Sequence, residues 1–216
     1  MIRKLLDKLH RLAYISVLLI IYIFAKLLFK LEVKGKENIP DKTDDLLIVS
    51  THNSYWDPPL IGISFGPRYH IHFIARKGLL TNPLLSLPVK VFSTTIDRDN
   101  FGKEDLIKIL KAFKRDGLIC IFPEGTTSEN APPKSGTIRL AEKTNRKFLP
   151  LKIVIRRSPL EFPFFFTPAK LIIGKPINLA ELKESSLDST RRSSNGQTDL
   201  DYQELSTRLM EKIYQL

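Results

Sequence analysis

Short apolar runs alternate with segments of helical periodicity, and this alternation constrains the fold more than any other feature. The runs predict strands at 31–35, 46–50, 70–76, 92–98, 118–122 and 148–155. The periodic segments predict helices at 58–65, 82–91, 103–117, 136–145 and 200–216. Such alternation is typical of an α/β domain, so we expect a mixed, largely parallel central sheet flanked by helices.

Helix-ending signals refine some of these boundaries. Asp57 is expected to cap helix 58–65, with Pro58 at its first position. Pro88 is expected to bend or end helix 82–91, and Gly117 to end helix 103–117. The polar, Ser-rich residues 184–199 predict a loop or a disordered segment.

The first 30 residues form the most biased segment. Residues 1–11 are basic and amphipathic, and the following run of 14 residues, Leu12–Ala25, carries no charge. Spanning a bilayer takes about 20 residues, and extending the run past Lys26 reaches about 18. We expect an N-terminal hydrophobic helical membrane anchor, either an interfacial or half-inserted helix or a single span, and a core helix is the alternative.

The expected organisation has three parts: membrane-anchoring helices at 1–30, an α/β domain at 31–180, and a polar loop with a final helix at 181–216. Lys and Arg outnumber Asp and Glu by 34 to 23, a net charge of +11 that favours an anionic partner. The single cysteine, Cys120, excludes a disulfide framework, and its apolar surroundings predict an inert buried thiol.

A histidine and an aspartate follow the predicted strand 46–50, in the stretch "THNSYWDPP". His52 and Asp57 would share the loop between this strand and the next helix, a common location for reactive side chains. A histidine titrates near neutrality, and a carboxylate on its other ring nitrogen fixes the tautomer, so the two could form a general-base pair. The alternative is that Asp57 only caps the helix and His52 only satisfies a loop carbonyl.

Anion-receptive residues follow other strands. "FPEGTTS" at 122–128 predicts a turn whose backbone N–H groups point outward and suit a phosphate, and Arg98 in "IDR" can grip a phosphate with two hydrogen bonds. Arg76, Lys77 and Lys134 add basic side chains. These sites would converge on one rim of the sheet, where α/β domains bind ligands.

These motifs together resemble the glycerolipid acyltransferases. The spacing of His52 and Asp57 is similar to the first motif of that family, "IDR" to the second, "FPEGT" to the third, and "LPL" at 149–151 to the fourth. The resemblance covers residues 45–160, and the most similar group is the 1-acyl-glycerol-3-phosphate acyltransferases.

The resemblance implies transfer of a fatty acyl group from an acyl thioester to the sn-2 hydroxyl of 1-acyl-glycerol-3-phosphate, giving phosphatidic acid. It makes His52 the base and Asp57 its orienter. The acceptor-site residues that it implies or leaves as candidates are Arg98, Glu124, Gly125, Thr126, Lys77 and Lys134. It implies no cofactor and no metal, a donor that is an acyl-carrier protein or coenzyme A thioester, a membrane-lipid acceptor, no nucleic acid, and a location on the cytoplasmic face of the inner or plasma membrane.

Three positions depart from the usual family pattern. Thr51 replaces a common asparagine, Phe92 a common glycine, and Thr127 the arginine that commonly follows "FPEGT". If that arginine binds the acceptor phosphate, Lys134, Lys77 or Arg76 must substitute for it, or the acceptor is another lyso-lipid, such as lyso-ornithine lipid.

Other classes explain less of the sequence. A metal-dependent hydrolase would use His52 and Asp57 with His70 and His72, but no third ligand motif is evident. A nucleic-acid binder would explain the charge, but not the apolar N-terminus. A non-catalytic basic membrane-binding protein would not need the histidine and aspartate pair.

Overall fold

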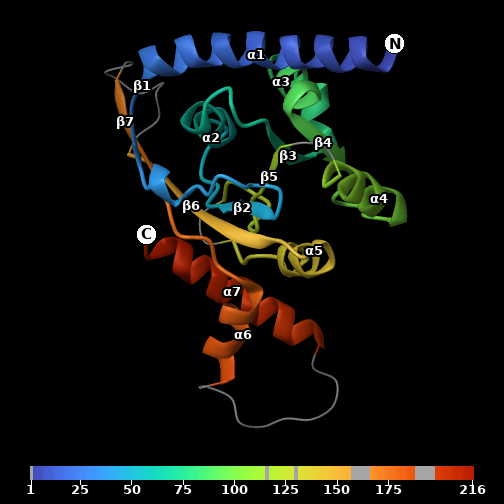
Figure 1. Ribbon diagram of the computed structural model, residues 1–216, viewed down its shortest axis with the longest axis vertical. Coiled ribbons are helices and arrows are strands. Elements are labelled where there is room, and N and C mark those ends of the chain that lie inside the picture. Colours follow the sequence, from blue (N-terminus) through green and yellow to red (C-terminus); the bar gives the residue numbers. More distant parts are fainter. Residues whose placement is uncertain (1, 115–116, 129–130, 157–165, 188–197) are drawn as a thin grey trace.

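A computed structural model describes residues 2–114, 117–128, 131–156, 166–187 and 198–216 (Figure 1). The strands are β1 Phe29–Lys34, β2 Leu46–Ser50, β3 Ile71–Arg76, β4 Ser93–Ile96, β5 Leu118–Ile121, β6 Lys147–Ile155 and β7 Thr167–Ile173. The helices are α1 Ile2–Leu28, α2 Asp57–Phe65, α3 Pro83–Phe92, α4 Lys103–Ala112, α5 Gly136–Thr144, α6 Leu179–Leu187 and α7 Thr198–Tyr214. Short 3-10 turns occur at Lys36–Asn38 (η1) and Lys77–Thr81 (η2).

The strands form one seven-stranded sheet in the order β1-β7-β6-β2-β5-β3-β4. Strands β6 and β7 pair antiparallel, and the other neighbouring pairs are parallel. The predicted mixed, largely parallel sheet flanked by helices is therefore confirmed. Every residue of the central strand β2 is buried, as expected for a strand covered on both faces.

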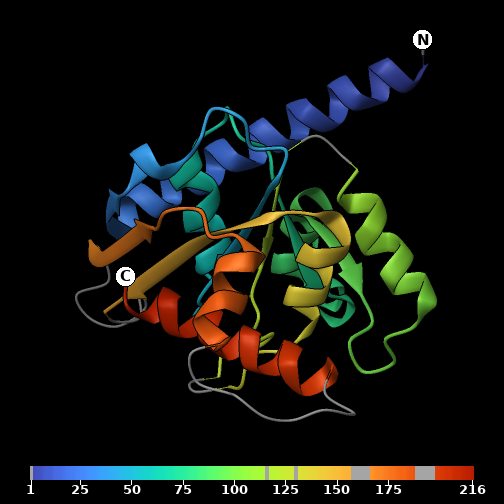
Figure 2. The same cartoon turned by 60° about the horizontal axis from the view of Figure 1, so that its bottom comes forward.

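Helices cover both faces of the sheet, with α1, α2 and α3 on one and α4, α5, α6 and α7 on the other (Figures 1 and 2). Successive side chains of a strand point to opposite faces. Leu46 and Ile48 of β2 accordingly enter the core under α1 and α2, whereas Leu47 and Val49 enter the core under α4, α5 and α7. The alternation of strands and helices thus produces a three-layer domain.

Two helix ends differ from the prediction. Helix α3 continues past Pro88 to Phe92, so the proline does not end it; the carbonyl that loses a partner there belongs to Leu84, a residue that is 84% exposed. Helix α4 ends at Ala112 rather than at Gly117. Gly117 instead adopts φ +114 beside the carbonyl of His70, where a Cβ would lie only 2.2 Å from the oxygen.

Two elements were not predicted. Residues 167–173 form β7, which pairs with both β6 and β1 and so joins the strand after α1 to the main sheet. Helix α6 extends to Leu187, although the Ser-rich composition predicted a loop from residue 184. The rest of that predicted loop, residues 188–197, lies outside the described residues.

The N-terminal segment is one continuous helix, α1, which lies across α2 and α3 (Figure 1). Tyr14 and Ala25 are buried in the core, and the Tyr14 hydroxyl accepts the backbone N–H of Ile71 at 3.1 Å. Other apolar residues of α1 remain exposed. Within the described part of the chain, no helix combines the length and the apolarity that crossing a membrane requires.

Candidate active site

The candidate residues gather at the carboxyl ends of four neighbouring parallel strands. His52 follows β2, Lys77 follows β3, Arg98 follows β4 and Glu124 follows β5. Strands that run parallel end at the same edge of a sheet, so these loops meet on one rim, where α/β domains commonly bind ligands.

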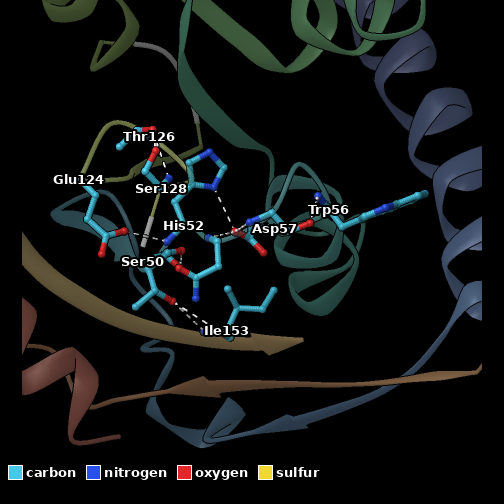
Figure 3. Close-up of polar contacts among 11 residues, drawn as sticks. Ser50, His52, Trp56, Asp57, Glu124, Thr126, Ser128 and Ile153 are labelled. Atoms are coloured by element: carbon cyan, nitrogen blue, oxygen red, sulfur yellow. Dashed lines mark hydrogen bonds and ion pairs between the residues drawn. The ribbon is translucent and has the colours of Figure 1, made fainter. Parts of the chain in front are cut away.

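The carboxylate of Asp57 organises the loop after β2. Its Oδ2 atom accepts hydrogen bonds from the backbone N–H groups of Asn53 at 2.7 Å and Ser54 at 2.9 Å, and lies 3.0 Å from Nδ1 of His52 (Figure 3). Trp56, not Asp57, is the N-cap of α2. The predicted cap role is therefore wrong, because the buried carboxylate faces back toward the loop and not along the helix.

The bond to Asp57 sets the tautomer of His52. A carboxylate only accepts hydrogen bonds, so Nδ1 carries the proton and Nε2, across the ring, keeps a free lone pair. The imidazole stacks on the ring of Phe122, with 4.1 Å between centroids. The His52 side chain is 16% exposed and lines a cavity, so a group in that cavity can reach it.

Hydrogen bonds to β6 and to the turn after β5 hold the backbone beside His52. The hydroxyl of Thr51 accepts the backbone N–H of Ile153 at 3.1 Å, which ties the end of β2 to β6. The backbone N–H of His52 donates to Oε2 of Glu124 at 3.1 Å (Figure 3). The other carboxylate oxygen of Glu124 accepts a hydrogen bond from the hydroxyl of Tyr214. Sequence reasoning missed Tyr214, since no local pattern connects two residues 90 positions apart.

A mostly apolar cavity of about 860 Å³ borders this loop. Side chains from α1, α2, β3, α3 and the loops after β2, β4 and β5 line it, among them Ile21, Trp56, Phe73, Leu85 and Phe92. Its polar lining includes His52, Arg76, Arg98, Thr126 and Thr127. Glu124, Lys77 and Lys134 are not part of its lining.

Arg98 connects the end of β4 to the turn after β5. Its guanidinium donates to the carbonyl oxygens of Gly125 and Ile74. Burial of the guanidinium is the larger cause that lowers the pKa of Arg98, and the nearby charge of Arg76 is the smaller one. Gly125 adopts φ +67, and a Cβ there would lie 3.3 Å from Arg98 Nη1 and 3.6 Å from Lys134 Cε. The turn therefore lies between two cationic side chains.

The other residues predicted to bind an anion are arranged differently. The N–H of Gly125 donates to the carbonyl of Phe122 at 3.0 Å, so this N–H closes the turn and does not point outward as predicted. Thr126 accepts the N–H of Ser128 at 3.2 Å through its hydroxyl. Arg76 forms an exposed ion pair with Asp99 at 2.5 Å, and Lys77 is exposed at the start of η2.

The histidines that a metal hydrolase would use have other partners. His72 Nε2 lies 2.7 Å from the hydroxyl of Thr94, and the ring of His70 packs edge-on against Tyr14. In the described residues, no three side chains of His, Cys, Asp or Glu are grouped so that they could hold a metal ion.

Comparison with known proteins matches this chain to acyltransferases. The acyltransferase family model matches residues 30–154. The 1-acyl-sn-glycerol-3-phosphate acyltransferase of Bacillus subtilis is 32% identical over 152 residues, which cover 69% of this chain and 75% of that protein. The protein of the same name from Streptococcus pneumoniae is 25% identical over 171 residues, 74% of this chain and 60% of that protein.

The fold is similar to that of a solved acyltransferase structure. The 1-acyl-sn-glycerophosphate acyltransferase PlsC from Thermotoga maritima aligns with a TM-score of 0.57 and 25% sequence identity. The alignment covers 92% of this chain and 80% of that chain, so the likeness extends well beyond the loops of the site.

Proposed function

This chain belongs to the acyltransferase family, and we propose that it transfers a fatty acyl group from an acyl thioester to the sn-2 hydroxyl of 1-acyl-glycerol-3-phosphate, forming phosphatidic acid. The observation that carries this proposal is the bond of 3.0 Å between His52 and Asp57 at the wall of a mostly apolar cavity of about 860 Å³. An apolar cavity suits a fatty acyl chain, and an oriented imidazole suits deprotonation of an alcohol.

His52 acts as general base in this mechanism. Its Nε2 takes the proton of the acceptor hydroxyl as the oxygen attacks the thioester carbonyl, and Asp57 stabilises the imidazolium that forms. The new C–O bond forms, the C–S bond breaks, and the imidazolium returns the proton to the departing thiolate. The thioester is already activated, so positioning and electrostatic stabilisation supply the rate.

Arg98 and Lys134 are the proposed contacts for the acceptor phosphate. They flank Gly125 beside the cavity, and Lys134 brings a cation to the region where Thr127 replaces the usual arginine. Arg98 can offer parallel donors, whereas Lys134 supplies a point charge. Lys77, exposed and outside the cavity lining, is the third candidate.

The protein is also proposed to work on a membrane surface at the cytoplasmic face. Large apolar side chains are exposed on two helices, at Leu19, Ile20, Ile23, Phe24 and Leu27 of α1 and at Leu84 and Leu87 of α3. Exposed apolar groups on this scale mark an interaction surface, and both helices also line the cavity, through Ile21 and Leu84. A lipid acceptor would then reach the cavity from the bilayer surface, while the donor, an acyl-carrier protein or coenzyme A thioester, would come from the aqueous side.

The acyl-transfer proposal is tested with purified protein in detergent, the two thioester donors, and lyso-lipid acceptors with and without a phosphate group. Phosphatidic acid should form from 1-acyl-glycerol-3-phosphate, and His52→Ala should abolish the reaction while thermal unfolding shows a retained fold. Wild-type activity in that variant would reject the role of His52 as base.

The phosphate contacts are tested by comparing Arg98→Ala, Lys134→Ala and Lys77→Ala. The first two should raise KM for the phosphate-bearing acceptor more than for a phosphate-free lyso-lipid. Lys147→Ala, at the amino end of β6 and so far from the rim, controls for the loss of one positive charge. Equal changes for both acceptors would contradict a phosphate contact.

The membrane surface is tested by flotation with vesicles that contain anionic phospholipid. Leu84→Asp, at a residue that is 84% exposed, should bind the vesicles less than wild type does. Ile107→Asp is the matched control, because Ile107 is an exposed apolar residue on α4, across the sheet from α3. Equal binding by both variants would argue against the α3 surface.

A further inference from the structure

The last turn of α7 reaches the carboxylate that supports the candidate catalytic loop. The hydroxyl of Tyr214 donates to Oε1 of Glu124, while Oε2 of the same carboxylate accepts the backbone N–H of His52 at 3.1 Å. Glu124 is 4% exposed, so little water is available to replace either partner. One buried carboxylate therefore connects the C-terminal helix to the residue proposed as the base.

The end of α7 is itself held against the sheet. Lys152 of β6 donates through its ammonium group to the carbonyl of Tyr214 at 2.5 Å. Leu216 packs against Gly174 so closely that a Cβ on that glycine would lie 2.9 Å from Leu216 Cδ2. The backbone carrying Tyr214 is thus fixed independently of the bond to Glu124.

Tyr214 is present as a hydrogen-bond donor at physiological pH. Burial of its hydroxyl, followed by the hydrogen bond to Glu124 and the charge of that carboxylate, raises the pKa of Tyr214 to about 12. Because the proton stays on the hydroxyl, Glu124 Oε1 keeps a donor throughout the range in which acyl transfer is measured.

We propose that Tyr214 is a positioning residue for acyl transfer, whose hydroxyl holds Glu124 in the orientation that fixes the backbone of His52. The inference rests on the acyl transfer proposed above. With both oxygens bonded, the carboxylate has one orientation. Without Tyr214 it can rotate, and the N–H of His52 loses a fixed acceptor. The imidazole would then spend less time at the correct distance from an acceptor hydroxyl, to which rates are sensitive.

The test compares Tyr214→Phe with Tyr202→Phe. Tyr202 is the matched control, since it lies on the same helix and its hydroxyl donates to another glutamate, Glu142, at 2.5 Å, away from the cavity. Tyr214→Phe should lower kcat about five- to tenfold, the scale of one hydrogen bond, with KM for both substrates changed by less than about twofold. Tyr202→Phe should leave both constants unchanged, and thermal unfolding of the two variants compares their stability.

A second readout follows the proposed link without using activity. Hydrogen exchange of the His52 amide should become faster in Tyr214→Phe and stay unchanged in Tyr202→Phe. A kcat of Tyr214→Phe equal to that of the control, or a lowered kcat with unchanged exchange at His52, would overturn the inference. Wild-type protein that transfers no acyl group to any lyso-lipid would instead overturn the proposed function, and the catalytic role of Tyr214 with it.

Discussion

Replacing Asp57 tests whether one carboxylate both holds the loop and orients the base. Its Oδ2 accepts two backbone N–H groups, from Asn53 and Ser54, besides the contact with His52. A hydrogen bond to a charged acceptor contributes about 1.5–3 kcal/mol, against about 1 kcal/mol for a neutral one. Asp57→Ala removes both backbone bonds, which together contribute about 3–6 kcal/mol. We expect a loss of about 3 kcal/mol, the lower end of that range, because Asn53 is exposed and its N–H can bond water instead.

Asp57→Asn should separate the two roles. An amide oxygen can still accept the two backbone N–H groups as neutral bonds, so the loss of stability should be about 1–2 kcal/mol. The imidazolium, however, loses its carboxylate, a change that lowers kcat by about 10⁴ in the serine-protease triad. We expect kcat to fall at least about 10³-fold in Asp57→Asn, while the protein remains folded.

Urea denaturation and steady-state acyl transfer measure the two effects. Asp97→Asn is the control, because Asp97 also accepts two backbone N–H groups in a turn, from Asp99 and Asn100, but has no histidine partner. It should change kcat less than about threefold. If Asp57→Asn kept more than a tenth of wild-type kcat, Asp57 would be only a loop-holding residue and the base-pair reasoning would be refuted.

Three further predictions concern single residues. Gly125→Ala should lower the free energy of unfolding by about 1–2 kcal/mol, because alanine is strained at φ +67. The added methyl group should also displace Arg98 and so raise KM for the phosphate-bearing acceptor. Denaturation measures the first effect and steady-state kinetics the second, and an unchanged KM would show that Gly125 does not shape the acceptor site. Cys120 should resist a thiol reagent at pH 8 until urea unfolds the chain, because burial raises its pKa well above the usual range; rapid labelling of the native protein would contradict this. The folded-state pKa of Tyr214 is raised to about 12 from an ordinary 10.0, so its hydroxyl stabilises the fold fully below pH 10, and this contribution is lost as pH rises through 12. The difference in unfolding free energy between wild type and Tyr214→Phe should therefore shrink between about pH 10 and pH 12. A constant difference would show that the hydroxyl is not shielded.

Local patterns in the sequence were enough to predict the fold class and the loop of the candidate base. Apolar runs and helical periodicity predicted most strands and helices, since the spacing of apolar residues along the chain decides which face of a strand or helix can be buried. His52 and Asp57 are five positions apart on one turn, so their contact could be predicted without tertiary information.

Long-range contacts could only be learned from the tertiary structure. Pairing of β7 with β1 and β6 and the bond from Tyr214 to Glu124 each join segments far apart in the chain. For Arg98 and Gly125 the sequence predicted the shared rim but not the bond between them. Such contacts depend on how whole layers pack, and no spacing in the sequence encodes them. For the same reason, composition predicted a loop from residue 184, where α6 continues to Leu187, because packing of Leu182 into the core stabilises the helix despite its polar last turn.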